Sequence, residues 1–81
     1  MDFKDFFKNQ LRKLRKEAGE TQVQAAKAIG LSSRFYQSLE LGENLPNLEN
    51  FIALADHFNV SLDYLAGRTE ERGPGCGSKR S

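Results

Sequence analysis

The chain is divided into short apolar segments that begin at hydroxyl or amide residues and are separated by glycines. A serine, threonine or asparagine before a helix accepts a hydrogen bond from the helix's free backbone amides. Glycine readily adopts the left-handed conformation that ends a helix. The candidate starts are Thr21, Ser32, Asn47 and Ser61, and the candidate ends are Gly19, Gly30, Gly42 and Gly67. Because the segments show helical periodicity and no strand-like alternation, we predict an all-α fold.

The first two segments show how this pattern works. An apolar stripe at spacings of three and four predicts a first helix that ends at Gly19. The stripe consists of Phe3, Phe7, Leu11, Leu14 and Ala18. In the second segment Thr21 and Gln24 fit a capping box, in which each side chain bonds the backbone of the other residue. Val23, Ala26 and Ile29 are then expected to face inward.

The remaining segments predict three more helices. We expect a third from about Ser33 to Leu41, a fourth after Asn47, and a short fifth over Leu62–Ala66. These segments give five predicted helices within a domain of residues 1–67. Residues 68–81 have no periodic apolar pattern, which predicts a flexible tail or linker.

Composition excludes several classes of protein. A chain of 81 residues predicts one small domain. No apolar run is long enough to span a membrane, and the N-terminus lacks a signal-peptide core. The single cysteine, Cys76, cannot form an internal disulfide, so we expect a reducing, cytoplasmic setting. His57, the only histidine, has no cysteine cluster or catalytic arrangement around it in the sequence. We therefore predict no metal, no cofactor, no small-molecule ligand and no enzymatic activity.

Charge is distributed unevenly along the chain. The formal net charge of +1 does not by itself indicate a nucleic-acid binder. Five basic residues lie between Lys8 and Lys16, whereas the span from Glu20 to Ala66 has two basic and six acidic residues. That span therefore has a net charge of −4, which any DNA-binding interpretation must accommodate.

The second and third predicted helices are joined by a tight turn at Gly30, as in a helix-turn-helix. Such a unit presents its second helix to the major groove of DNA. On a helical wheel Tyr36 and Leu39 share one side and are expected to be core. Arg34 and Gln37 lie across from them. Arginine can bond guanine as a fork, and glutamine can bond adenine in the same two-point way.

Longer motifs support this interpretation. From Leu11 to Gly67 the chain resembles the helix-turn-helix family of phage repressors and the small bacterial regulators (XRE family) built like them. The matching motifs are "LRxxxGxTQ", "IGLSSRxYQSLELG", "PNLExFIxLA" and "VSLDYLAG". The resemblance implies an all-α, compact five-helix bundle of the lambda-repressor type and transcriptional control. It also implies a homodimer on double-stranded operator DNA with two-fold symmetry, acting as a repressor.

The resemblance also assigns residues. Candidates for base contacts are Ser33, Arg34, Gln37 and Ser38. Candidates for contacts to the DNA backbone are Gln22, Ser32 and Phe35. From the residues themselves we add Asn44 of the loop, which could donate a hydrogen bond, and Lys8 and Arg12 from the basic flank of the first helix. Arg15 and Glu40 are expected to form a structural ion pair. Candidates for the dimer interface are Val60, Leu62, Tyr64 and Leu65, since a five-residue helix is not expected to bury all four.

One departure from the family leaves an alternative open. Relatives often have lysine or arginine between Gly42 and Pro46, whereas this chain has Glu43, which would repel phosphates. The alternative is a protein-interaction module that keeps the helix-turn-helix fold and binds a partner regulator through its acidic and aromatic surfaces. Salt-sensitive retention on duplex DNA distinguishes the two, because phosphate contacts weaken as salt rises.

Overall fold

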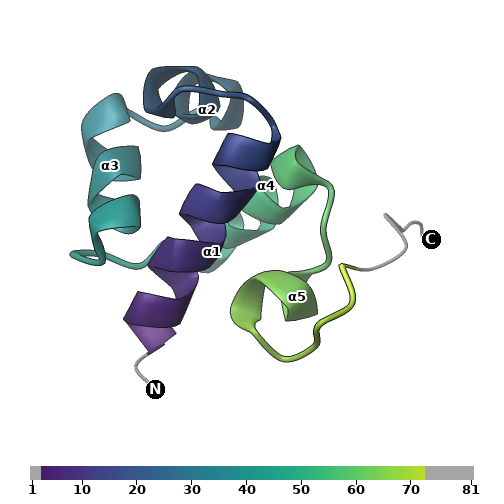
Figure 1. Ribbon diagram of the computed structural model, residues 1–81. Helices are drawn as coiled ribbons and strands as arrows, with labels where there is room; N and C mark the ends of the chain where they lie inside the picture. The colour runs from purple at the N-terminus through teal and green to yellow at the C-terminus, as the bar shows by residue number, and fades with distance from the viewer. Residues whose placement is uncertain (1–2, 73–81) are drawn as a thin grey trace.

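The structure, a computed structural model, describes residues 3–72 and is all-helical over that range (Figure 1). The prediction of five helices in an all-α bundle is confirmed. The helices are α1 Phe3–Glu17, α2 Gln22–Ile29, α3 Ser33–Leu41, α4 Leu48–Phe58 and α5 Leu62–Ala66. Within these residues no helix is both long and apolar enough to cross a bilayer.

The predicted helix starts are confirmed in atomic detail. Thr21 Oγ1 accepts a hydrogen bond from the Gln24 amide at 3.1 Å, and Gln24 Oε1 accepts one from the Thr21 amide at 2.9 Å, which completes the capping box. Ser32, Asn47 and Ser61 cap α3, α4 and α5 in the same way through their side-chain oxygens. Each of these helices therefore has a boundary fixed by local hydrogen bonds.

The end of α4 differs from the others. It is closed by Asn59, with φ of +57°, and not by a glycine. Asparagine is the other residue that adopts the left-handed conformation at low cost, because its short polar side chain can bond locally. A search for glycine alone misses this helix end.

α1 runs through the middle of the molecule, with α3 on one side and α5 on the other (Figure 1). α2 packs against α3 and α4, and α4 also packs against α5. Phe7 of α1 is fully buried, and its ring lies 5.9 Å from the ring of Phe51 in α4. Leu11 and Leu14 of α1 and Tyr36 and Leu39 of α3 complete the centre of the core.

Two expectations about burial need correction. Val23 of α2 is 56% exposed and does not face inward. The interface candidates Val60, Tyr64 and Leu65 are buried in the monomer, and only Leu62 is exposed. The reason is that α1 and α4 both cover α5, and Gln10 of α1 donates a hydrogen bond to the Tyr64 carbonyl at 3.3 Å. The sequence-based expectation was drawn from the length of α5 alone, and it did not include the surface of α5 that α1 and α4 cover.

Residues 68–72 also differ from the flexible tail or linker expected for 68–81. The Ser61 amide donates a hydrogen bond to the Arg72 carbonyl at 2.7 Å. The Arg72 guanidinium lies 2.8 Å from a Glu17 carboxylate oxygen and sits over the Tyr64 ring, 5.5 Å from its centre. This segment therefore folds back onto α1 and α5. The rest of the expected tail, including Cys76, lies outside the described residues.

Candidate nucleic-acid interface

α3 stands at the edge of the molecule, held there by the turn that follows α2 (Figure 1). Gly30 has φ of +92°, and the Leu31 amide donates to the Ala26 carbonyl at 2.9 Å, which closes α2. Tyr36 and Leu39 bury the inner side of α3 against the core. The opposite side of α3 therefore faces away from the protein.

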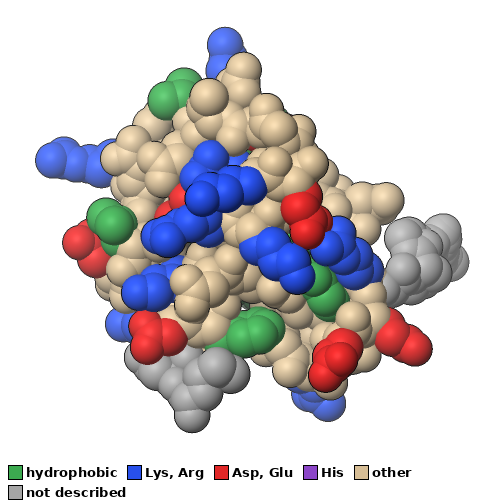
Figure 2. All heavy atoms as spheres, in the orientation of Figure 1, with side chains coloured by type: hydrophobic (Ala, Val, Ile, Leu, Met, Phe, Trp, Pro, Cys, Tyr) green, Lys and Arg blue, Asp and Glu red, His purple; other side chains and the backbone are tan. Residues whose placement is uncertain are grey.

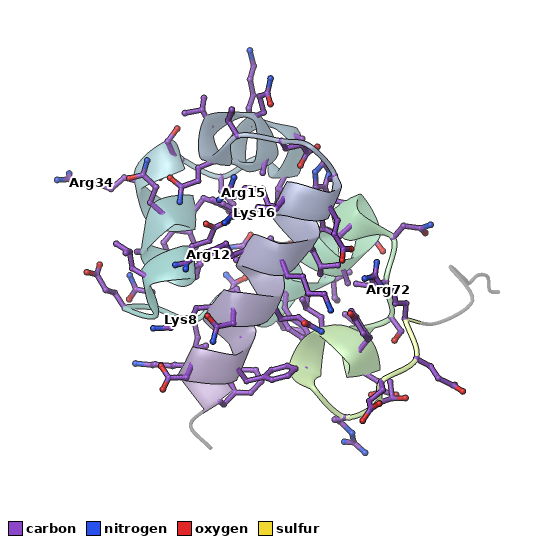
Figure 3. All side chains as sticks on the ribbon, viewed as in Figure 1. Lys8, Arg12, Arg15, Lys16, Arg34 and Arg72 are labelled. Atoms are coloured by element: carbon purple, nitrogen blue, oxygen red, sulfur yellow. The ribbon has the colours of Figure 1, made fainter. Side chains whose placement is uncertain are left out.

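Two predicted base-contact residues lie on that outer side. Arg34 and Gln37 are exposed, and Figure 3 shows Arg34 extending away from the body of the protein. Ser33, the first residue of α3, is half-buried. A guanidinium and an amide held on one open helix face have the donors and acceptors needed to bond the edges of base pairs.

Beside this face is a shallow hollow of about 370 Å³ between α3 and the loop that follows it. Its lining brings together residues that the sequence analysis proposed for base and backbone contacts. They are Ser32, Arg34, Phe35, Ser38 and Asn44, joined by Glu43. The structure thus places Glu43, the acidic residue of the loop, in the lining of the same hollow as Arg34.

Ser38 has a different environment from the other base-contact candidates. It is largely buried, and its hydroxyl donates to the Phe35 carbonyl at 2.6 Å. The same oxygen accepts a hydrogen bond from Asn44 Nδ2 at 3.0 Å. The Ser38 hydroxyl proton is therefore used inside the protein and is not free to donate to a base. Its oxygen, as an acceptor, holds the Asn44 side chain in place.

Glu40 is the centre of a polar cluster beneath this face. Its side chain is 1% exposed, and Arg15 donates to it from Nε at 2.7 Å and from Nη2 at 3.2 Å. The expected ion pair between Arg15 and Glu40 is thus present. Gln22 Nε2 donates to the same carboxylate at 3.0 Å. One carboxylate therefore joins α1, α2 and α3, the elements that position the outer face.

The environment of Glu40 keeps it charged. Burial alone would raise the pKa of its carboxyl. The hydrogen bonds from Arg15 and Gln22, together with the charge of Arg15, outweigh burial and hold the pKa of Glu40 below its ordinary value. Gln22 was proposed to contact the DNA backbone, and here its amide is oriented by Glu40. Its second amide hydrogen remains chemically available for a phosphate.

Tyr36 shows the cost of packing against this cluster. Burial, with the nearby Glu40 carboxylate, raises the pKa of the Tyr36 hydroxyl. Within residues 3–72, that hydroxyl is the buried side-chain polar group that lacks a hydrogen-bond partner. The Glu40 carboxylate and the Arg15 guanidinium nevertheless lie close enough to the hydroxyl to act on its pKa. We therefore expect Tyr36→Phe to change the free energy of unfolding by less than about 1 kcal/mol, because the ring stays in the core and the hydroxyl makes no hydrogen bond of good geometry. Urea denaturation measures the change, and a loss well above about 1 kcal/mol would show that the hydroxyl is fully paired with Glu40.

Figure 2 shows lysine and arginine side chains gathered on the face over α1. Two of them, Lys8 and Arg12, lie beside the C-terminal end of α3 (Figure 3). Arg12 Nη2 donates to the Glu40 carbonyl at 3.1 Å, near the end of α3 where free carbonyls gather partial negative charge. The Lys8 stem packs beside Gly42, where an added Cβ would lie 3.1 Å from Lys8 Cδ. Lys8 Nζ also lies 3.5 Å from Asp5. Both candidates for backbone contacts therefore also brace α3.

The contact of His57 is among those that the sequence analysis missed. His57 Nε2 lies 2.8 and 3.0 Å from the two carboxylate oxygens of Glu20, just before the cap of α2. The sequence analysis gave His57 no partner. Nothing in the local pattern links two residues 37 positions apart. This contact connects α4 to the start of the helix-turn-helix.

The comparisons with known proteins agree with this geometry. The chain is 43% identical over 61 residues to the cryptic phage CTXphi transcriptional repressor RstR of Vibrio cholerae, covering 75% of this chain and 54% of that protein. It is 32% identical over 60 residues to the transcriptional regulator ImmR of Bacillus subtilis, covering 74% of this chain and 47% of that protein.

A third relative is the uncharacterized regulator YobD of Bacillus subtilis, 36% identical over 64 residues, covering 79% of this chain and 57% of that protein. This chain spans about half the length of these curated relatives. No solved structure gives a significant match. The profile of the helix-turn-helix family matches residues 11–65, which include the whole of α2 and α3. This chain therefore belongs to the phage-repressor-like helix-turn-helix family.

Proposed function

We propose that this protein is a sequence-specific DNA-binding transcriptional regulator that represses by occupying a promoter. The observation that carries the proposal is the open outer face of α3, where Arg34 and Gln37 project from a helix whose other side is locked in the core. Relatives named as transcriptional repressors or regulators support the same function. No chemistry is required, because a bound protein competes with RNA polymerase for the duplex. The setting would be the cytoplasm, where bacterial DNA lies.

In this proposal the residues divide by role. Arg34 and Gln37 bond base edges, with Ser33 beside them at the start of α3. Backbone contacts come from the start of α2, where Gln22 and the free amides face a phosphate, and from Lys8 at the flank of α1. Ser32 and Phe35 line the hollow, and Asn44, held by Ser38, donates from its rim. Each copy in a homodimer would place this face on one half-site of a two-fold symmetric operator.

The test is a binding selection from a random duplex library, with Arg34→Ala compared to the parent. We expect the parent to enrich a two-fold symmetric site. Arg34→Ala should bind that site about 1–3 kcal/mol more weakly, a factor of roughly 5 to 150, and relax the sequence preference at one position of each half-site.

Arg68→Ala is the matched control. Arg68 is an exposed arginine that directly follows the cap of α5, and α5 lies on the other side of α1 from α3 (Figure 1). Its loss should leave the selected sequence unchanged. If the folded parent enriches no sequence even at low salt, the proposal of DNA binding is wrong. The alternative, a module that binds a partner regulator through its acidic and aromatic surfaces, then takes its place.

A further inference from the structure

Leu41, the last residue of α3, is an apolar side chain that the core does not use. It is 59% exposed, and among the large apolar residues exposed within residues 3–72 it is the one that belongs to α3. Single exposed leucines are common on protein surfaces, so exposure alone assigns no function. The position of Leu41 on α3 is therefore the informative observation.

Leu41 shares the outer face of α3 with the two exposed candidates for base contacts. It follows Gln37 by four positions and Arg34 by seven, and these spacings place side chains on one side of a helix. Tyr36 and Leu39 occupy the opposite side and are buried. The outer face of α3 thus presents two polar side chains and one apolar side chain in a single stripe.

The backbone at Leu41 is held in place by two contacts. The Glu43 amide donates to the Ser38 carbonyl at 3.0 Å, which closes the last turn of α3. The second contact comes from α1, where Arg12 donates to the Glu40 carbonyl at 3.1 Å. That carbonyl belongs to the peptide unit that joins Glu40 to Leu41. Leu41 is therefore presented from a fixed backbone, which lowers the entropy that a contact with a ligand would cost.

The major groove of DNA has one alkyl group at the edges of its base pairs, the C5 methyl of thymine. The hydrogen-bond donors and acceptors there cannot pair with a leucine side chain. Leucine pressed against a donor or acceptor would remove its water without replacing the lost hydrogen bond, which is unfavourable. A leucine on a helix face that enters this groove is therefore suited to thymine.

We propose that Leu41 contacts the C5 methyl group of a thymine and makes the sequence preference of this protein depend on that methyl. This inference rests on the proposed function, in which the outer face of α3 meets the base edges. Seven residues of α-helix advance by about 10 Å, close to three base-pair steps of DNA. With α3 along the groove, the thymine lies about three base pairs from the base that Arg34 contacts.

Other partners fit this position less well. A phosphate is bound by hydrogen-bond donors and positive charge, and the Leu41 side chain has neither. A protein docked on Leu41 would also have to pair the neighbouring Arg34 and Gln37, because all three lie on the same face. Contact with a protein would not depend on a methyl group of the DNA, so the two cases differ in a measurable way.

The test removes one methyl group from the DNA. Each thymine in one half-site of the selected operator is replaced in turn by uracil, which keeps the base pairing but lacks the C5 methyl. At one position the parent should bind the uracil duplex about fourfold more weakly, the factor expected for one buried methyl group. Leu41→Ala should bind the thymine and uracil duplexes within about 1.5-fold of each other there, because its contact is already lost.

Leu48→Ala is the matched control. Leu48 is a leucine of α4 that is 71% exposed, and it lies outside the stripe on α3. Its truncation should keep the preference for thymine over uracil that the parent shows. Both leucines are so exposed that the fold should tolerate these changes, which circular dichroism checks.

The outcomes separate this inference from the proposed function. A parent that selects a site but binds thymine and uracil equally at every position overturns the inference alone. So does an equal loss on uracil substitution in the parent and in Leu41→Ala, or a preference for thymine that Leu48→Ala also loses. A parent that selects no site overturns the proposed function, and the inference with it.

Discussion

Replacing Arg15 with alanine is expected to lower the free energy of unfolding by about 3 kcal/mol. The change leaves the Glu40 carboxylate, 1% exposed, with Gln22 as its remaining hydrogen-bond donor. A buried charge that has lost its counter-ion costs several kcal/mol, and the lower part of that range applies because the Arg15 side chain is itself 14% exposed. Urea denaturation followed by circular dichroism measures the loss.

Two comparisons separate this effect from a loss of α1 packing. Lys13→Ala removes an exposed charge from the same helix and should change stability by less than about 0.5 kcal/mol. The double change Arg15→Met with Glu40→Leu should recover much of the loss, since it removes both charges. If Arg15→Ala lowers the free energy of unfolding no more than Lys13→Ala does, water hydrates the Glu40 carboxylate in place of Arg15, and the ion pair does not stabilise the fold.

The ion pair also has a signature in pH. Because the folded-state pKa of Glu40 lies below its unfolded value, its contribution to stability is present above the unfolded pKa and is lost as pH falls through the folded pKa. Without Arg15, burial should raise the pKa of Glu40, so the acid transition of Arg15→Ala should move to higher pH than that of the parent.

Replacing Phe7 with alanine is expected to lower the free energy of unfolding by about 3–5 kcal/mol. Phe7 is fully buried, and its ring joins α1 to α4 through Phe51. The truncation removes apolar burial and leaves a cavity between the two helices. Chemical denaturation measures the change, and the midpoint should fall with little change in slope if unfolding stays two-state.

Phe3 provides the matched control, because its ring stacks on Phe7 at 5.9 Å but is 41% exposed. Phe3→Ala should cost no more than about 1 kcal/mol, since its surface is partly in water already. Equal losses in Phe3→Ala and Phe7→Ala would contradict the view that the contact between Phe7 and Phe51 holds α1 on α4.

Local signals predicted the helices well because their boundaries are local events. The cap of α2 involves Thr21 and Gln24, three positions apart, and the structure contains both of its bonds. Burial was predicted less well, because it depends on which distant helix covers a residue. Tyr64 is buried because α1 and α4 cover α5, and Val23 is exposed because nothing in the described chain covers that side of α2.

The same division applies to the candidate interface. A helical wheel was enough to place Arg34 outside and Tyr36 inside. It did not show that Ser38 is held by Phe35 and Asn44. Nor did it reveal that Gln22 donates to Glu40. The contact between Gln22 and Glu40 joins α2 to α3, and the contact between Asn44 and Ser38 joins the loop to α3. The direction of side chains on a single helix therefore does not predict these contacts.

The fold of residues 68–72 has a practical consequence for attaching this protein to something else. Arg72 is fixed to Glu17 and Tyr64 on the side of the molecule away from α3 (Figure 3). Cys76, the single cysteine, follows four positions later in the sequence. A thiol-reactive dye or a surface linker therefore reacts at one position only. Because Arg72 is held on the side of the molecule away from α3, the chain leaves the described part of the protein on that side, and a tether joined to the sequence after Arg72 starts opposite α3.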